Sequence, residues 1–193
     1  RHEHRARREH PGLAVTLTLP RFTTLADYLD HYAAETPAAD AVWHDGALLS
    51  YVELAEKVEQ MAGSLAAAGL SAGDRVAALS TPRPEFLISL LAAFKLGAVW
   101  VGLNPRYTYR ELAHVVAESK PRLILSLPQI DGRKLDADVA RLVEEFGADQ
   151  GYRLDAGESA GSLKALPEPA AFTPHTSDPL DAATIVFTSG SSG

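Results

Sequence analysis

The middle of the chain alternates between short apolar runs and stretches whose apolar residues recur at helical spacing. The apolar runs are typical of buried strands, and the stretches between them carry helix start and stop signals. Pro84 stands in the first turn of one such helix, and Gly97 follows its end. Strands that alternate with helices predict an α/β fold, a largely parallel sheet with helices on both faces. The expected strands are residues 76–79, 98–101 and 123–125, and the expected helices are residues 84–96 and 109–119.

Helical spacing also predicts which side of a helix is buried. In the helix at 84–96, Phe86, Leu90 and Phe94 follow one another four residues apart. Side chains at this spacing share one face. We therefore expect these three residues to face the core.

Further elements are predicted on both sides of this central unit. Asp45-Gly46 separates two short apolar runs and is typical of a two-residue hairpin turn. Ser50 and Glu53 form a capping box that begins a helix, which Gly69 ends. The remaining expected elements are a helix capped at Thr24 that continues to about residue 35, an amphipathic helix at 136–146, and a buried strand at 184–187.

Two segments lack this regularity. Residues 1–21 are a charged tail that leads into an arm with an extended pattern at 13–19. Residues 151–179 are rich in Gly, Ser, Pro and Ala, and such a long connection is either mobile or pinned across a surface.

Composition narrows the class of protein. With 193 residues and 46% apolar residues, the chain can bury a sizeable core. Its formal net charge of −7 argues against a general nucleic-acid or anionic-membrane binder, so small-molecule partners are favoured. The absence of cysteine excludes disulfides and thiolate chemistry, and no stretch is apolar enough to span a bilayer. His2 and His4 lack the spacing of a structural metal site, so we expect no metal site among the residues of this chain. Because no stretch could span a bilayer and the charged start is not followed by an apolar core of signal-peptide type, we expect a soluble, cytoplasmic protein.

In a parallel sheet, ligands approach the carboxyl ends of the strands. Arg83 and Arg106 fall on the loops that follow the first two expected strands of the central unit. Either arginine could contact an anionic substrate group, although a loop arginine can equally be a solvated charge.

The last residues carry a different signal. Thr188, Ser189, Gly190, Ser191, Ser192 and Gly193 offer hydroxyls and unobstructed backbone N–H groups directly after an expected strand. Such groups can converge on phosphate oxygens. The pattern is not that of the NTPase P-loop, which requires a Gly-Lys pair. A flexible Gly/Ser linker would have a similar composition.

The sequence shows no other catalytic constellation. It contains no G-x-S-x-G elbow, no H-E-x-x-H pair and no carboxylate cluster with a recognisable spacing. The terminal loop can position a phosphate and stabilise its developing charge, but it offers no acid or base. Catalysis by these 193 residues alone is therefore not expected.

The motifs together resemble a known family. Phe187-Thr-Ser-Gly-Ser-Ser-Gly193 is similar to the phosphate-binding signature of the adenylate-forming (AMP-binding) superfamily. Residues 85–112 resemble the stretch that precedes this signature in acyl- and aryl-CoA synthetases. The motifs Leu49-Ser-Tyr-Val-Glu-Leu54 and Gly69-Leu-Ser-Ala-Gly-Asp-Arg-Val76 fit the same family. The resemblance thus covers nearly everything from about residue 22 onward.

The resemblance implies an ATP-dependent acid–thiol ligase, either a fatty-acyl or an aryl-CoA synthetase. It implies ATP, Mg²⁺ and coenzyme A, and a reaction that forms an acyl-adenylate and then an acyl-CoA. Residues 188–193 would hold the β- and γ-phosphates of ATP. Residues 22–193 would be the N-terminal part of the AMP-binding domain, so the catalytic lysine and the acyl pocket would lie beyond Gly193.

Two other interpretations stay open. An amino-acid-activating domain of a peptide synthetase has the same loop, and a binding module could keep the fold without the chemistry. The acid that is activated and the oligomeric state are not encoded in these residues.

Overall fold

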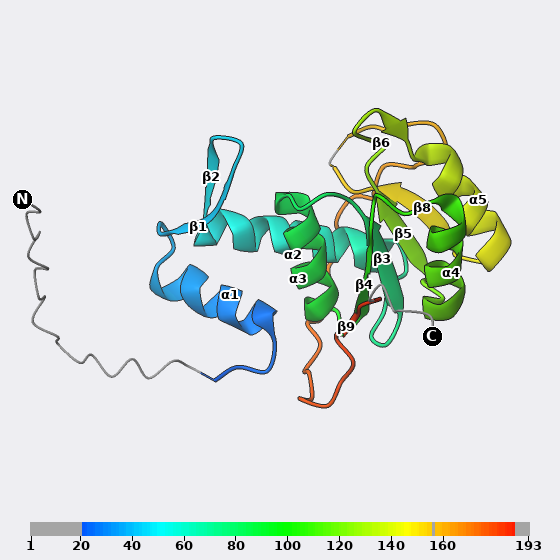
Figure 1. Ribbon diagram of the computed structural model, residues 1–193. Coiled ribbons are helices and arrows are strands. Elements are labelled where there is room, and N and C mark those ends of the chain that lie inside the picture. The colour runs from blue at the N-terminus through cyan, green and yellow to red at the C-terminus, as the bar shows by residue number, and fades with distance from the viewer. Residues whose placement is uncertain (1–20, 156, 188–193) are drawn as a thin grey trace, which may run out of the picture.

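The computed structural model describes residues 21–155 and 157–187 and is built on a parallel sheet (Figure 1). Its strands lie in the order β8-β5-β3-β4-β9, and every neighbouring pair is parallel. The three strands predicted for the central unit are therefore confirmed. The strand predicted at 184–187 is present only at 184–185, at one edge of the sheet, and it is not buried as expected, since Val186 is 75% exposed. The strands are β3 (Arg75–Leu79), β4 (Val99–Leu103), β5 (Leu123–Ser126), β8 (Gln150–Arg153) and β9 (Thr184–Ile185).

Helices cover both faces of the sheet, as the sequence predicts (Figure 1). One layer contains α1 (Leu25–Glu35), α2 (Tyr51–Ala67) and α3 (Pro84–Lys95), and the other contains α4 (Tyr109–Ser119) and α5 (Asp136–Phe146). Because successive crossovers pass over opposite faces, the central strand β3 is fully buried at Val76 and Leu79. None of the helices in the described part of the chain combines the length and the apolar character that crossing a bilayer requires.

Local signals fix where these helices begin and end. Thr24, Ser50 and Thr108 each form a complete capping box at the start of α1, α2 and α4. Pro84 occupies the first turn of α3. Gly97 and Gly147 follow the ends of α3 and α5 with φ values of 67° and 70°, a conformation that favours glycine.

A two-stranded hairpin stands apart from the main sheet (Figure 1). It consists of β1 (Asp40–His44) and β2 (Ala47–Ser50), paired antiparallel. Asp45 and Gly46 both have positive φ values, 49° and 80°, which is the turn geometry that matches the twist of the two strands. The predicted hairpin is confirmed.

Two pairings were not predicted. Residues 151–179 were expected to lack secondary structure, but β8 extends the sheet beyond β5. The rest of this connection is pinned across the surface, where Ala170 N–H donates to Gly63 O on α2 and Lys164 N–H donates to Gly151 O. The second pairing is a short hairpin of β6 (Gln129–Ile130) and β7 (Arg133–Lys134). The arm predicted at 13–19 and the tail before it lie outside the described residues.

The buried face of α3 differs from the expected one. Phe94 is buried, but Phe86 and Leu90 are only half-buried against the edge of the core. Ile88 and Leu91 are the long aliphatic side chains that α3 buries most deeply, at 5% and 4% exposure. Because α3 is packed between the sheet and α2, its buried arc is wider than a single line of residues.

A lysine is buried at the end of this otherwise apolar helix. The Lys95 side chain is only 6% exposed, and its Nζ lies 2.7 Å from Asp30 on α1 and 2.6 Å from Glu59 on α2. Burial alone would lower the pKa of Lys95, but hydrogen bonds to the two carboxylates outweigh it, and the pKa is raised. The ammonium group therefore joins three helices.

Replacing Lys95 with methionine should cost about 1–3 kcal/mol of unfolding free energy, because the two carboxylates lose their shared cation. The cost is moderate since Asp30 and Glu59 are about half-exposed and stay solvated. A raised pKa means that this stability is present below the unfolded pKa of lysine and is lost only as pH rises through the folded value. Urea titrations at about pH 6 and about pH 9 should thus give the same difference in unfolding free energy between the original protein and Lys95→Met. Lys57→Met, at an exposed position on α2, is the control and should change stability by under about 0.5 kcal/mol.

Candidate functional site

The carboxyl ends of the strands define the candidate site. The chain leaves β3 toward α3 on one face of the sheet and leaves β4 toward α4 on the other face (Figure 1). In α/β proteins, ligands bind outside the carboxyl ends of the strands. Residues 80–83 and 104–107 follow the carboxyl ends of β3 and β4, as the sequence predicts.

Arg83 lies at the start of α3 and is already paired. Its Nε lies 2.6 Å from Glu85 Oε2, and both side chains are 31% exposed. Partial burial opposes ionisation of Glu85, but the hydrogen bond from Arg83 and nearby positive charge outweigh it and lower the pKa of this carboxyl. Arg83 would have to exchange this partner to contact a substrate anion.

Arg106 is exposed on the neighbouring loop. Its backbone N–H donates to Asn104 Oδ1 at 2.9 Å, which shapes the turn after β4. Within residues 21–155 and 157–187, its guanidinium forms no ion pair or side-chain hydrogen bond. The two predicted arginines thus follow adjacent strands, but the structure shows no contact between them.

Sequence analysis did not identify Arg133, which holds the loop after β4 in place. The Nη1 of this half-buried residue donates to Tyr107 O at 2.6 Å and, more weakly, to Pro105 O at 3.4 Å. The other end of its guanidinium pairs with Asp138 on α5. The available signal was the Asp131-Gly132 pair, which turns the chain so that Arg133 points back to this loop.

Strand β9 leads toward the glycine- and serine-rich segment. It pairs with β4 in parallel register, Trp100 opposite Thr184, and Trp100 N–H donates to Ala183 O at 2.9 Å. The Phe187 ring then lies 6.4 Å from the His114 ring on α4. The six candidate phosphate-binding residues, 188–193, lie outside the described residues. The structure therefore shows only where the chain leads into this segment, next to β4.

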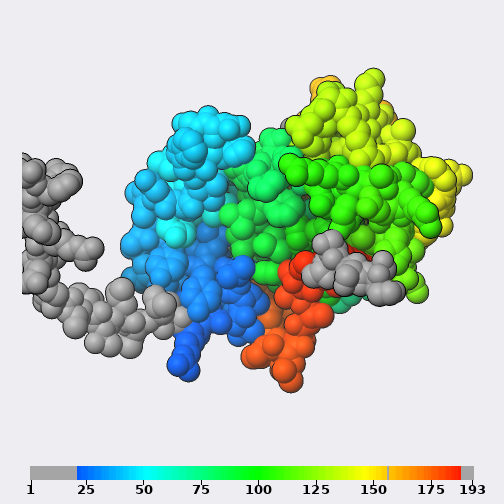
Figure 2. Space-filling view, in the orientation of Figure 1, coloured from blue at the N-terminus to red at the C-terminus, as the bar shows by residue number. Residues whose placement is uncertain are grey.

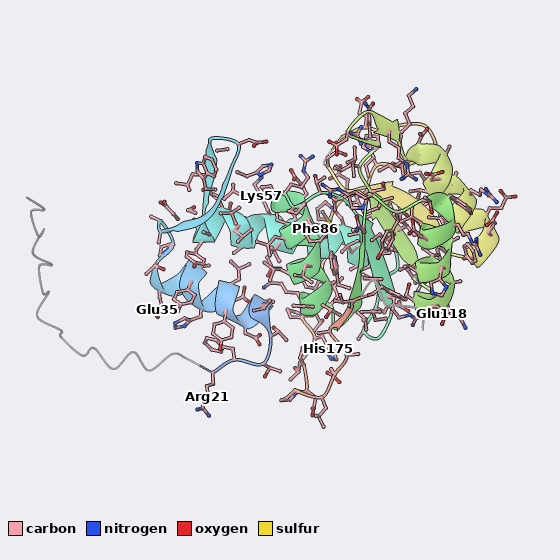
Figure 3. The ribbon with its side chains drawn as sticks, viewed as in Figure 1. Arg21, Glu35, Lys57, Phe86, Glu118 and His175 are labelled. Carbon is pink, nitrogen blue, oxygen red and sulfur yellow. The ribbon has the colours of Figure 1, made fainter. Side chains whose placement is uncertain are left out.

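The segment that precedes β9 is anchored at the end of α3 (Figure 3). His175 N–H donates to Lys95 O at 2.8 Å, and the His175 ring packs directly over Gly97. The ring also faces Asp181, with Nε2 and Oδ2 3.3 Å apart, and Asp181 accepts from Asp178 N–H. These contacts fix the approach of the chain to β9.

Gly97→Ala should destabilise the protein by about 2–3 kcal/mol. An alanine at φ 67° costs about 1–2 kcal/mol, and its Cβ would collide with the His175 ring, which adds about 1 kcal/mol. Gly147→Ala is the matched control, since Gly147 has φ 70° and open space around it, and it should show the backbone cost alone. Thermal or urea unfolding measures both variants. If a His175→Ala background leaves the cost of Gly97→Ala unchanged, the ring contact is not responsible.

No group of three or more His, Cys, Asp or Glu side chains in the described part of the chain could hold a metal ion. The described loops after β3 and β4 contribute the side chains of Arg83 and Arg106.

The chain belongs to the family of AMP-binding enzymes, whose sequence model matches residues 29–193. A feruloyl-CoA synthase from an Amycolatopsis species is 35% identical over 161 residues, which cover 83% of this chain and 30% of that protein. A plipastatin synthase from Bacillus subtilis is 30% identical over 90% of this chain and 6% of its own length. The solved N-terminal subdomain of NpsA from Klebsiella oxytoca superposes with a TM-score of 0.66 at 26% identity, covering 88% of this chain and 39% of that one. The chain spans less than a third of the length of the feruloyl-CoA and plipastatin synthases.

Proposed function

We propose that the protein to which this chain belongs is an AMP-forming carboxylate–CoA ligase. The observation that carries the proposal is the family match over residues 29–193 together with the 161-residue similarity to feruloyl-CoA synthase. The α/β fold supports it, since the phosphate-type sequence at 188–193 follows a strand of the parallel sheet. On this proposal the carboxylate first attacks the α-phosphate of ATP, which forms the acyl-adenylate and releases pyrophosphate. The thiol of CoA then attacks the acyl carbon, which forms the thioester and releases AMP.

Residues 188–193 would hold the β- and γ-phosphates of ATP. Their hydroxyls and backbone N–H groups are neutral donors that match phosphate oxygens, and no bulky side chain obstructs the backbone. Magnesium would neutralise phosphate charge, and it usually keeps several waters and needs few protein ligands. The donor set therefore fits a triphosphate. Arg106, and Arg83 if it exchanges Glu85, are proposed contacts for an anionic part of a substrate.

We assign residues 22–193 to the N-terminal portion of the AMP-binding domain and residues 1–21 to a preceding arm. The catalytic lysine and the acyl pocket are proposed to lie in later parts of the full-length protein. A cytoplasmic location goes with this proposal, because ATP and CoA are available there.

Pyrophosphate exchange by the full-length protein tests the proposal. With Mg-ATP and a panel of aryl, fatty and amino acids, exchange should depend on an aryl or fatty acid, and added CoA should then yield the thioester. The similarity to plipastatin synthase supports the second candidate, an amino-acid-activating domain, for which exchange would depend on an amino acid and CoA would not be consumed. If no acid supports exchange, the protein is a non-catalytic member of the family.

A further inference from the structure

A cleft of about 750 Å³ opens beside the β1–β2 hairpin, away from β9. Its volume is in the range of ligand sites. Its walls come from segments far apart in the sequence: the inner face of the β1–β2 hairpin, α2, the start of α3, the end of β8 and residues 165–169. Figure 2 shows the hairpin as a projection at the upper left of the molecule, and Figure 3 places Lys57 on α2 beside it.

This cleft is separate from the candidate phosphate site. It extends from the end of β8 to the start of α3, which follows β3, whereas the terminal loop follows β9 at one edge of the sheet. Two strand spacings, about 10 Å, separate β3 from β9. The cleft borders one of the proposed substrate contacts, because Glu85 in its lining pairs with Arg83.

The floor of the cleft is apolar. Ile88 and Leu154 are 5% and 1% exposed, and Leu166 packs against the same core. Pro167 and Pro169 form a stiff wall on one side. Apolar side chains of a bound molecule would find matching surface here.

The lining has an excess of acidic side chains, although Glu85 and Asp155 are paired with Arg83 and Arg153. Its five carboxylates face two cations, Lys57 and Arg153, so the excess is three negative charges, or two when Arg83 is included. The hydrogen bond from Arg153 holds the pKa of Asp155 below its ordinary value, so this carboxyl stays ionised even though it is partly buried. The surface therefore repels phosphates and carboxylates and attracts cations. The carboxylates belong to Asp45, Glu85, Asp155, Glu158 and Glu168.

The positions of the acidic residues indicate the size of the ligand. Asp45, Glu158 and Glu168 are exposed and lie on three separate segments at the rim. A small amine carries one positive charge and could meet one of them, whereas a peptide with several lysines or arginines could meet all three. We propose that this cleft is a docking site for a basic, amphipathic segment of a partner protein, with its apolar side chains on the floor and its cations at the rim.

The test measures binding of a fluorescein-labelled peptide by anisotropy in about 50 mM salt. The probe has about 14 residues of Leu and Lys, with the leucines on one helical face. A Leu-to-Ser version keeps its charge and loses its apolar face. The variant Glu158→Lys with Glu168→Lys reverses the rim. Its control, Glu118→Lys on α4 with Glu144→Lys on α5, makes the same change in net charge on the other helical layer. Figure 3 labels Glu118.

The full-length protein should bind the Leu-Lys peptide, the rim variant should bind it at least about tenfold more weakly, and the control should stay within about twofold. The Leu-to-Ser peptide should also bind at least about tenfold more weakly. Binding by residues 1–193 but not by the full-length protein would show that later parts of the protein cover the cleft, and would overturn the proposal. Equal loss in both variants would show charge attraction without a site and would overturn the proposal. So would two other outcomes: binding that occurs only after residues 1–21 are removed, or self-association that the rim variant abolishes. All four altered residues are exposed, so unfolding midpoints should stay constant.

Discussion

Replacing Ser191 and Ser192 with alanine in the full-length protein should slow acyl-adenylate formation about ten- to a hundredfold. A hydrogen bond to a charged group contributes about 1.5–3 kcal/mol, and each 1.36 kcal/mol of barrier is about a factor of ten in rate, so one lost bond accounts for this range. The later step, thioester formation from supplied acyl-adenylate, should change much less because pyrophosphate has already left. Single-turnover assays of the two half-reactions measure both effects.

Ser191→Thr with Ser192→Thr is the matched control for that experiment. It keeps both hydroxyls, so adenylation should recover most of its rate if hydrogen bonding to phosphate is the cause. Equal damage to both half-reactions, or a threonine variant as slow as the alanine variant, would contradict a phosphate-specific role for these serines.

Leu91→Ala should lower the free energy of unfolding by about 2–5 kcal/mol, since removing a fully buried leucine side chain loses its transfer energy and leaves a cavity. Leu90→Ala, one residue away on the same helix, should cost only about 1–2 kcal/mol because Leu90 is half-buried and the site can fill with solvent. Urea titration of the two variants compares them. Equal costs would contradict the described orientation of α3, in which Leu91 is buried more deeply than Leu90.

Much of the fold follows from local signals in the sequence. Pro84 and Gly97 delimit α3, the capping boxes at Thr24, Ser50 and Thr108 begin three other helices, and Asp45-Gly46 turns the hairpin. Each signal acts within a few residues, so it can be recognised without knowing the partners of the segment.

The elements that were missed depend on distant partners. Strand β8 has no apolar run, and its Gly151 is required because a Cβ there would lie 2.8 Å from Val139 on α5. Only the packed structure shows why that glycine belongs to a strand. The β6–β7 hairpin has the same Asp-Gly signal as β1–β2, but strands of two residues each are too short to show alternation. In the sequence, Lys95 only interrupts an apolar helix. Its role is apparent only in the folded structure, where it pairs with Asp30 and Glu59 from two other helices.

The sequence predicted where the arginines of the candidate site lie, but not all of the contacts that hold them and their loops in place. The positions of Arg83 and Arg106 after adjacent strands follow from the β-α-β order. The pairing of Arg83 with Glu85 could be suspected from their spacing, but the anchoring of the following loop by Arg133 could not. The phosphate-binding assignment of residues 188–193 stays a prediction, because these residues lie outside the described ones.

Nucleotide products measured by chromatography, with the full-length protein, a carboxylic acid, CoA and Mg-ATP, test the central claim most directly. An AMP-forming ligase should release AMP and pyrophosphate in equal amounts with the acyl-CoA formed, and residues 1–193 alone should release neither, because the purine and metal contacts and the lysine are proposed to lie elsewhere. ADP and phosphate as products would contradict the proposed reaction. AMP formation by the 193-residue chain would show that these residues contain a complete site.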